Sequence, residues 1–195
     1  MSHPDRPQAP GYLANMMARL FHEVMHEGIA ALGVARTYQI PRPYQRLTVL
    51  ENVALAAMFG AGALDAKEAE REASHWLQFV GLGGRLDSLP ATLNLHQRKF
   101  VELARALASR PKLVMLDEVL SGLTPAEITS AIALVREIRS RGATILFIEH
   151  NMRAVLELTD RLYVLNYGEV IAQGNPREVV RDPAVVAAYL GSAHA

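Results

Sequence analysis

The sequence has 195 residues, half of them hydrophobic and 21% charged, which is the balance of one globular domain rather than of a disordered chain. The 20 Lys and Arg residues equal the 20 Asp and Glu residues, so no overall field attracts nucleic acid or an anionic membrane. Cysteine is absent, which excludes disulfides, thiolate metal sites and a cysteine nucleophile, and suits a reducing compartment.

The N-terminal part of the sequence lacks the features of a membrane-targeted protein. Residues 1–12 are rich in proline and polar side chains, which predicts a loose arm rather than a signal peptide. Residues 13–32 have apolar side chains near helical spacing. The longest apolar runs, such as residues 143–148, are far too short to span a bilayer. We therefore expect a cytoplasmic location, with any membrane link made through a partner protein.

The helix expected at 13–32 contains His-Glu-Val-Met-His at residues 22–26, which matches the zinc metalloprotease pattern H-E-x-x-H. On a helix His22 and His26 lie one turn apart, and Glu23 could activate a zinc-bound water. A third ligand would have to come from elsewhere, and the rest of the sequence has no protease-like architecture. An amphipathic helix with histidines facing water is the preferred interpretation, and a zinc-dependent hydrolase is a distant alternative.

The next part of the sequence predicts a short strand followed by helices. Gly33 opens the strand candidate, and the Pro-Arg-Pro sequence at 41–43 closes it. Thr48 with Glu51 three residues later forms the capping-box pattern that starts a helix. Further helices are expected over 65–80 and over 97–108, the second capped by Asn94.

The C-terminal half alternates apolar segments with a helical one. Buried strands are expected at 112–118 and 143–150, separated by a helix over 125–141. Apolar strands that alternate with helices predict an α/β fold with a parallel sheet covered on both faces. The chain is expected to finish with a hairpin (161–166 and 169–173) and short helices near Pro176 and Pro183.

Asp117 and Glu118 stand at the carboxyl end of the first of these strands, where open α/β sheets bind their ligands. An aspartate there can hold magnesium, and a neighbouring glutamate can polarise a water molecule aimed at a phosphorus atom. Two acids that simply face solvent are the alternative. The surroundings favour a site, because Pro125 is placed to start a helix, His150 ends the next strand and Gln39 follows the short early strand.

The ordered series of these segments resembles the ATP-binding subunit of ABC transporters, from about Gly28 to the C-terminus. Residues 33–56 resemble the Q-loop region of the branched-chain amino acid uptake branch, and residues 149–191 resemble its C-terminal half. The resemblance implies an incomplete P-loop NTPase (ABC ATPase) fold, an α/β parallel sheet flanked by helices, with a helical subdomain inserted at about 42–108. Residues 1–27 form an arm and helix unlike the family.

The resemblance also assigns roles to single residues. Asp117 corresponds to the aspartate that organises magnesium, and Glu118 to the catalytic base that orients the attacking water. His150 corresponds to the switch histidine at the terminal phosphate. Gln39 corresponds to the Q-loop glutamine, which senses magnesium and water and couples to the membrane subunit. The family's D-loop corresponds to Ser121, Gly122, Leu123 and Thr124, the last in place of the usual aspartate.

Residues 93–97, Leu-Asn-Leu-His-Gln, occupy the place of the family signature Leu-Ser-Gly-Gly-Gln, which contacts the partner subunit's nucleotide. The resemblance gives this role to Asn94, His96 and Gln97. Asn94 can donate a hydrogen bond, and the helix N-terminus behind it favours a phosphate. Leu95 and His96 add side chains where glycines let the backbone approach oxygen closely. A plain helix cap is the alternative role of Asn94.

The phosphate loop of this family, G-x-x-x-x-G-K-[ST], presents backbone N–H groups and a lysine to the phosphates. This sequence contains no Gly-Lys pair, since Lys67, Lys99 and Lys112 follow alanine, arginine and proline. In the family this loop lies well before the position of Gln39, in a segment that also supplies core strands and the helix that fills the centre of the sheet. We therefore expect exposed apolar surface, weak binding of Mg-ATP by this chain alone and negligible hydrolysis.

These features together predict the ATP-binding subunit of a branched-chain amino acid-type ABC importer, which uses Mg-ATP. Its expected partners are a second ATP-binding subunit, whose ATP-dependent closure drives transport, and the permease subunits at the inner face of the cell membrane. No nucleic-acid partner is expected. The alternatives are a truncated gene product and a catalytically inactive partner that completes another subunit's site through Asn94 and Gln97.

Overall fold

The computed structural model describes residues 32–190, which divide into two compact units over 32–151 and 152–190. Each unit has its own secondary structure and its own buried side chains. The expected N-terminal arm and the helix that would carry His22 and His26 lie outside the described residues. Within the described residues, no helix is both long and apolar enough to cross a bilayer.

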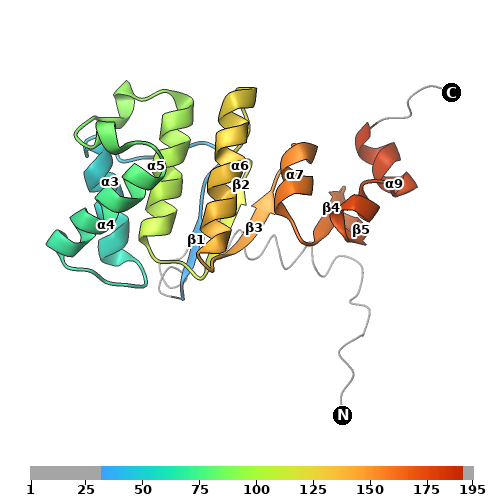
Figure 1. The fold of residues 1–195 in the computed structure, drawn as a ribbon, viewed down its shortest axis with the longest axis horizontal. Helices are drawn as coiled ribbons and strands as arrows, with labels where there is room; N and C mark the ends of the chain where they lie inside the picture. Colours follow the sequence, from blue (N-terminus) through green and yellow to red (C-terminus); the bar gives the residue numbers. More distant parts are fainter. Residues whose placement is uncertain (1–31, 191–195) are drawn as a thin grey trace, which may run out of the picture. The chain divides into compact units, whose positions relative to one another are not determined.

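A parallel sheet organises the unit over 32–151 (Figure 1). It contains β1 (Val34–Arg36), β2 (Leu113–Asp117) and β3 (Thr144–Ile148) in that spatial order, which confirms the predicted parallel arrangement. The register places Arg36 beside Met115 and Asp117 beside Ile148. Because parallel strands share one carboxyl edge, the residues that follow the three strands gather at that edge.

The three strands differ in burial. The middle residues of β2 are fully buried, as its apolar sequence predicts. The prediction that β3 is also a buried strand was wrong, because its last four residues are half-buried and Thr144 is exposed. Among the described residues β3 pairs on one side only, with β2, and this leaves its apolar side chains partly uncovered.

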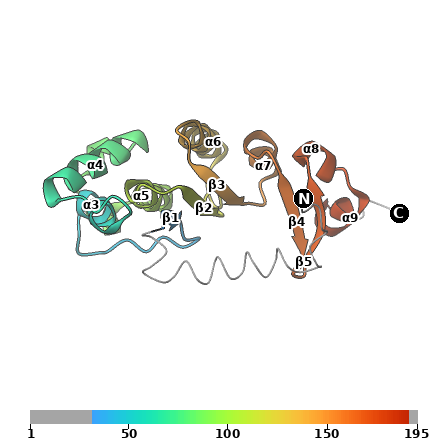
Figure 2. The same ribbon diagram turned by 90° about the horizontal axis from the view of Figure 1, so that it is seen from below.

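Helices supply the rest of this unit, and three of them pack against one another: α3 (Val49–Phe59), α4 (Ala66–Phe79) and α5 (Leu95–Ala108). Helix α6 (Pro125–Ser140) joins β2 to β3, and Figure 2 shows it beside β3. Capping boxes begin three of the helices: Thr48 with Glu51, Asn94 with Gln97, and Thr124 with Glu127. Short 3-10 turns at Gly83–Arg85 and Pro90–Thr92 connect α4 to α5.

The unit over 152–190 begins with α7 (Met152–Leu158), a helix that the sequence analysis did not predict. The predicted hairpin is confirmed as β4 (Leu162–Asn166) and β5 (Glu169–Gly174), which turn at Tyr167 and Gly168 with positive φ at both residues. The remaining elements are α8 (Pro176–Val179), α9 (Pro183–Val185) and a π-helical turn at Val186–Leu190. A small core of Val164, Val179 and Val185 supports the hairpin.

A buried lysine of α5 fixes the turn that follows β2. Lys99 is 4% exposed, and its Nζ donates to the carbonyl oxygens of Glu118 at 3.0 Å, Val119 at 3.4 Å and Ser121 at 2.6 Å. Burial lowers the pKa of Lys99, and the nearby Glu149 and Glu118 carboxylates oppose this effect. Lys99 therefore supplies the donor that these inward-turned carbonyls need.

Strand β3 fixes the same turn from its other side. The backbone N–H of Glu118 donates to the Ile148 carbonyl at 2.9 Å, which extends the β2–β3 pairing by one residue. The Glu149 carboxylate accepts from the N–H of Leu120 at 2.7 Å. The turn is thus tied to both α5 and β3, so its backbone is held in one conformation.

We expect Lys99→Met to lower the free energy of unfolding by about 1–3 kcal/mol, because methionine keeps the length of the side chain but leaves the carbonyls without a donor. Urea unfolding followed by the fluorescence of Trp76, the only tryptophan and part of α4, measures the change. The control is Lys67→Met on the exposed face of α4, which should change stability by less than about 0.5 kcal/mol. Equal effects of the two substitutions would contradict this role of Lys99.

The cap of α6 predicts a pH dependence. Glu127 accepts from the N–H and the hydroxyl of Thr124, both at 2.8 Å, and these bonds hold the pKa of Glu127 below its ordinary 4.5, with a smaller contribution from His96. A depressed folded-state pKa means that the carboxylate stabilises the fold above pH 4.5 and ceases to do so as the pH falls through the lowered pKa. The stability difference between the wild type and Glu127→Gln should therefore be largest near neutral pH and shrink in acid. A stability difference between the two proteins that stays constant from pH 7 to about pH 3 would refute this role of the Glu127 carboxylate.

Candidate functional site

Three of the residues predicted from sequence meet at the carboxyl edge of the sheet. The Gln39 side-chain amide donates to Oε2 of Glu118 at 2.5 Å. His150 Nδ1 lies 3.8 Å from the other carboxylate oxygen, Oε1, of Glu118. Asp117 precedes Glu118 at the end of β2. The loop after β1, the turn after β2 and the residues after β3 therefore contribute side chains to one place.

The backbone of Glu118 is unusual, since its φ is +46°, in the left-handed region that non-glycine residues seldom occupy. Such a conformation costs free energy and persists only where the surroundings impose it. Here Lys99 binds the Glu118 carbonyl and Ile148 binds its N–H. These two hydrogen bonds stabilise the strained backbone, and in this conformation the carboxylate of Glu118 faces Gln39 and His150.

An ion pair that the sequence analysis missed holds Asp117. Arg36, the last residue of β1, donates through Nη2 to Oδ2 of Asp117 at 2.9 Å. The Asp117 N–H donates to the hydroxyl of Thr37 at 3.3 Å. The signal was present in the sequence, because an arginine at the end of a strand that neighbours an acidic strand end can reach across to it.

The fit of these residues to magnesium depends on a nucleotide. Among the described residues, no group of three or more His, Cys, Asp or Glu side chains is arranged to hold a metal ion. Mg²⁺ is commonly held by one or two carboxylates together with water and phosphate oxygens. The oxygens of Asp117 and Glu118 suit that second mode, in which the phosphates complete the coordination.

The predicted signature residues form the start of α5. The Asn94 side chain accepts from the N–H of Gln97 at 2.8 Å, and the Gln97 side chain accepts from the N–H of Asn94 at 3.1 Å. His96 Nδ1 lies 3.4 Å from a carboxylate oxygen of Glu127, and its ring packs edge-on against Phe100. The cap role of Asn94 is therefore shown, and its oxygen is in use. The side-chain NH₂ of Asn94 is a hydrogen-bond donor, and it is the group that could bind a phosphate.

The predicted D-loop residues lie between the site and α6. Ser121 offers its carbonyl oxygen to Lys99, and Gly122 adopts a left-handed conformation with φ of +75°. A Cβ on Gly122 would lie 3.5 Å from the side chain of Leu95. Thr124 caps α6. Helix α5 thus holds this loop through Lys99, and the side chain of Leu95 lies beside Gly122.

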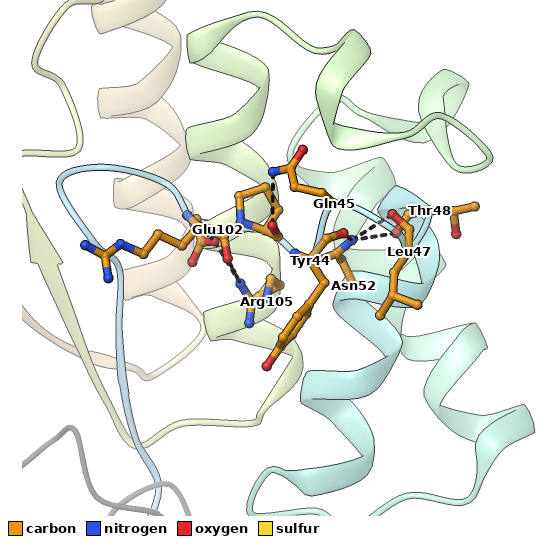
Figure 3. Close-up of polar contacts among 9 residues, drawn as sticks. Tyr44, Gln45, Leu47, Thr48, Asn52, Glu102 and Arg105 are labelled. Atoms are coloured by element: carbon orange, nitrogen blue, oxygen red, sulfur yellow. Dashed lines mark hydrogen bonds and ion pairs between the residues drawn. The ribbon is translucent and has the colours of Figure 1, made fainter.

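The segment after Gln39 is anchored to the helices by two buried polar side chains (Figure 3). Asn52 of α3 is fully buried, accepts from the N–H of Tyr44 at 2.7 Å and donates to the carbonyls of Tyr44, Leu47 and Thr48. Glu102 of α5 accepts from the N–H of Arg42 at 3.1 Å and from Arg105 at 2.8 Å. Sequence reading missed both anchors, because each looks like an ordinary polar residue in a helix.

Comparison with known proteins places these features in a family. A family model described as ABC transporter matches residues 21–121, and one described as Branched-chain amino acid ATP-binding cassette transporter matches residues 169–195. The site residues Gln39, Asp117 and Glu118 fall within the first match. The expected boundary of the family-like region at residue 28 remains a prediction.

Curated relatives and a solved structure agree with the family models. The chain is 36% identical over 179 residues to the high-affinity branched-chain amino acid transport ATP-binding protein BraF of Pseudomonas aeruginosa, covering 85% of this chain and 70% of that protein. It is 35% identical over 180 residues to LivG of Escherichia coli, with the same coverage. The ADP conformation of MJ1267, an ATP-binding cassette of an ABC transporter, superposes with a TM-score of 0.72 and 32% identity, covering 85% of this chain and 71% of that one. The chain therefore belongs to the ATP-binding cassette family of ABC transporters and has the P-loop NTPase fold of that family.

Proposed function

We propose that this chain is an ATP-binding subunit of an ABC importer of the branched-chain amino acid type. The observation that carries the proposal is the convergence of Gln39, Glu118 and His150 beside Asp117 at the carboxyl edge of the parallel sheet. The names of the relatives BraF and LivG support the substrate class. Mg-ATP is the proposed cofactor, and the proposed location is the inner face of the cell membrane, against the permease.

The side chains at this edge suit phosphoryl transfer to water. A bound Mg-nucleotide would supply the phosphoryl group and the cation that offsets its charge. Glu118 would accept a hydrogen bond from the attacking water and hold it, with Gln39 positioned to bind the same water. His150 is 65% exposed at its side chain and can reach a terminal phosphate oxygen. Asp117 would take the cation through its carboxylate.

Nucleotide affinity requires donors that these residues do not supply. The sequence contains no Gly-Lys pair and thus none of the phosphate-loop pattern. Glu118 and Asp117 are acids, which repel phosphate unless cations intervene, and the Arg36 guanidinium at this edge is already paired with Asp117. We infer that the 195 residues alone bind Mg-ATP weakly and that a second ATP-binding subunit is part of the working site.

A role toward a partner subunit uses the start of α5. Dimer closure would present Asn94 and Gln97 to the partner's nucleotide, with the N-terminal N–H groups of α5 behind them. Lys99, in the next turn of α5, donates to the loop after β2, and Leu95 lies beside Gly122 of that loop. If a bound phosphate shifts the start of α5, the hydrogen bonds of Lys99 would therefore pass that shift to the loop that carries Glu118.

Contact with the permease is proposed for the segment that follows Gln39. Ile40 is 70% exposed and Tyr44 is 51% exposed, which leaves apolar surface available on a segment anchored by Asn52 and Glu102. An anchored segment moves with the helices to which it is tied. It can therefore transmit displacement from Gln39 to a membrane partner.

We expect the isolated chain to show almost no nucleotide stabilisation. With a dissociation constant above about 10 mM, 1 mM Mg-ATP adds roughly 0.1 kcal/mol or less, which is about 0.5 °C or less in melting temperature. Thermal melts with and without Mg-ATP measure this. A rise of several degrees would show that donors outside the phosphate-loop pattern bind the nucleotide.

Mixing the chain with an intact ATP-binding cassette tests the partner role. If the chain completes the partner's site, the partner's ATPase rate should rise, and Asn94→Ala should reduce that rise by about 10-fold or more. Glu118→Gln should leave the rise unchanged, because Glu118 serves the chain's own site. Asp65→Ala, which removes the cap of α4, controls for the loss of a helix cap. An unchanged ATPase rate on mixing would remove the support for this role.

A further inference from the structure

Arg36 and Asp117 form an ion pair in a position that matters for cation binding. In the parallel register Arg36 lies beside Met115, and Asp117 lies two residues further along β2, on the same face of the sheet. The guanidinium reaches this next position and donates to Oδ2 at 2.9 Å. One of the two carboxylate oxygens that could bind a cation is therefore occupied by a side chain of the same protein.

The pair is half-buried, which strengthens its effect. The side chains of Arg36 and Asp117 are 18% and 21% exposed, so water and salt screen the two charges less than at an open surface. The guanidinium also lies 5.4 Å from the centre of the Tyr38 ring, which favours this location for the positive charge. An arginine stays protonated at all physiological pH values, so the positive charge at Asp117 is permanent.

We propose that Arg36 is a resident counter-ion that sets the affinity of Asp117 for divalent cations. This inference rests on the proposed function, in which Asp117 binds the cation of Mg-ATP. A guanidinium beside the carboxylate weakens its attraction for a second positive ion and repels that ion directly. Mg²⁺ binds at Asp117 only by sharing the carboxylate with Arg36 or by displacing it, so Arg36 keeps the site selective for a cation that arrives with phosphate charge.

The test compares variants that remove the positive charge at position 36 with a variant that keeps it. Arg36→Met removes the positive charge and keeps an apolar stem against the sheet, and Arg36→Gln removes it with a polar side chain. Arg36→Lys keeps the charge with a different geometry. If charge controls cation affinity, the two neutral variants should bind a divalent ion more tightly and the lysine variant should resemble the wild type.

The probe is Mn²⁺ added to the purified chain without nucleotide, with the free ion measured by electron paramagnetic resonance. We expect Arg36→Met to tighten Mn²⁺ binding by about 10-fold or more, because the substitution removes a unit positive charge that lies within hydrogen-bonding distance of the Asp117 carboxylate in a half-buried place. Asp117→Asn in the same background should abolish the gain. Arg36→Lys should stay within about threefold of the wild type. If Arg36→Met does not fold, as judged by circular dichroism, Arg36→Gln carries the same expectation.

The matched control is Arg110→Met, which also leaves a carboxylate without its arginine. Arg110 pairs with Glu72 of α4 at 3.0 Å, in another part of the same unit. Its removal should not change Mn²⁺ affinity measurably. A similar gain in Arg110→Met would overturn the proposal, because any uncovered acid would then suffice.

Two results separate the failure of this inference from the failure of the proposed function. If Arg36→Met and Arg36→Gln bind Mn²⁺ like the wild type while Asp117→Asn weakens binding, the counter-ion role is overturned and the cation site stands. If Asp117→Asn has no effect in either the wild-type or the Arg36→Met background, Asp117 does not bind a divalent ion without phosphate, and the counter-ion role is overturned; the proposed function, in which phosphates complete the coordination, would then fail only if Asp117→Asn also left Mn²⁺ binding unchanged when ATP is added.

Discussion

The candidate site depends on the ammonium group of Lys99. The turn after β2 carries Glu118 in a left-handed conformation and directs three carbonyl oxygens toward the buried ammonium group of Lys99. A carbonyl in that position needs a donor, and one lysine from α5 serves all three. Desolvation of Lys99 works against the arrangement, as the direction of its pKa shows, and the nearby Glu149 and Glu118 carboxylates partly offset this cost. Without Lys99 the turn would lose the support that offsets its backbone strain.

The same lysine ties the start of α5 to the loop after β2. Leu95 packs near Gly122, His96 lies beside Glu127 at the start of α6, and Lys99 reaches the loop carbonyls. These contacts join residues about 20 to 30 positions apart in sequence through side chains of different chemistry. A ligand that shifts the start of α5 must therefore also shift the loop or break several contacts at once.

Much of the architecture could be predicted from the sequence, because local chemistry dictates it. The capping box at Thr48, the cap residue Asn94 and the proline at position 125 predicted helix starts that the structure places within two residues, and apolar segments predicted the strands and the parallel sheet. The convergence of Gln39, Glu118 and His150 followed from strand ends at one edge. The contacts of Lys99 and Glu149 with the turn after β2 could not be predicted, because they act across distances that no local pattern encodes, whereas the pairing of Arg36 with Asp117 was missed although two neighbouring strand ends carried its signal. The burial of β3 was overestimated for a related reason, since apolar composition does not tell how many neighbours a strand has.

Strand β1 is only three residues long, and in the described part of the chain its ladder partner is β2. Its last residue neutralises Asp117, and the loop just after it supplies the amide that binds Glu118. Both acids are therefore covered by a single short segment at the rim of the sheet. Fraying of so small a segment needs little free energy compared with global unfolding. Because Arg36 and Gln39 belong to the same segment, any local opening there would expose the two carboxylates together.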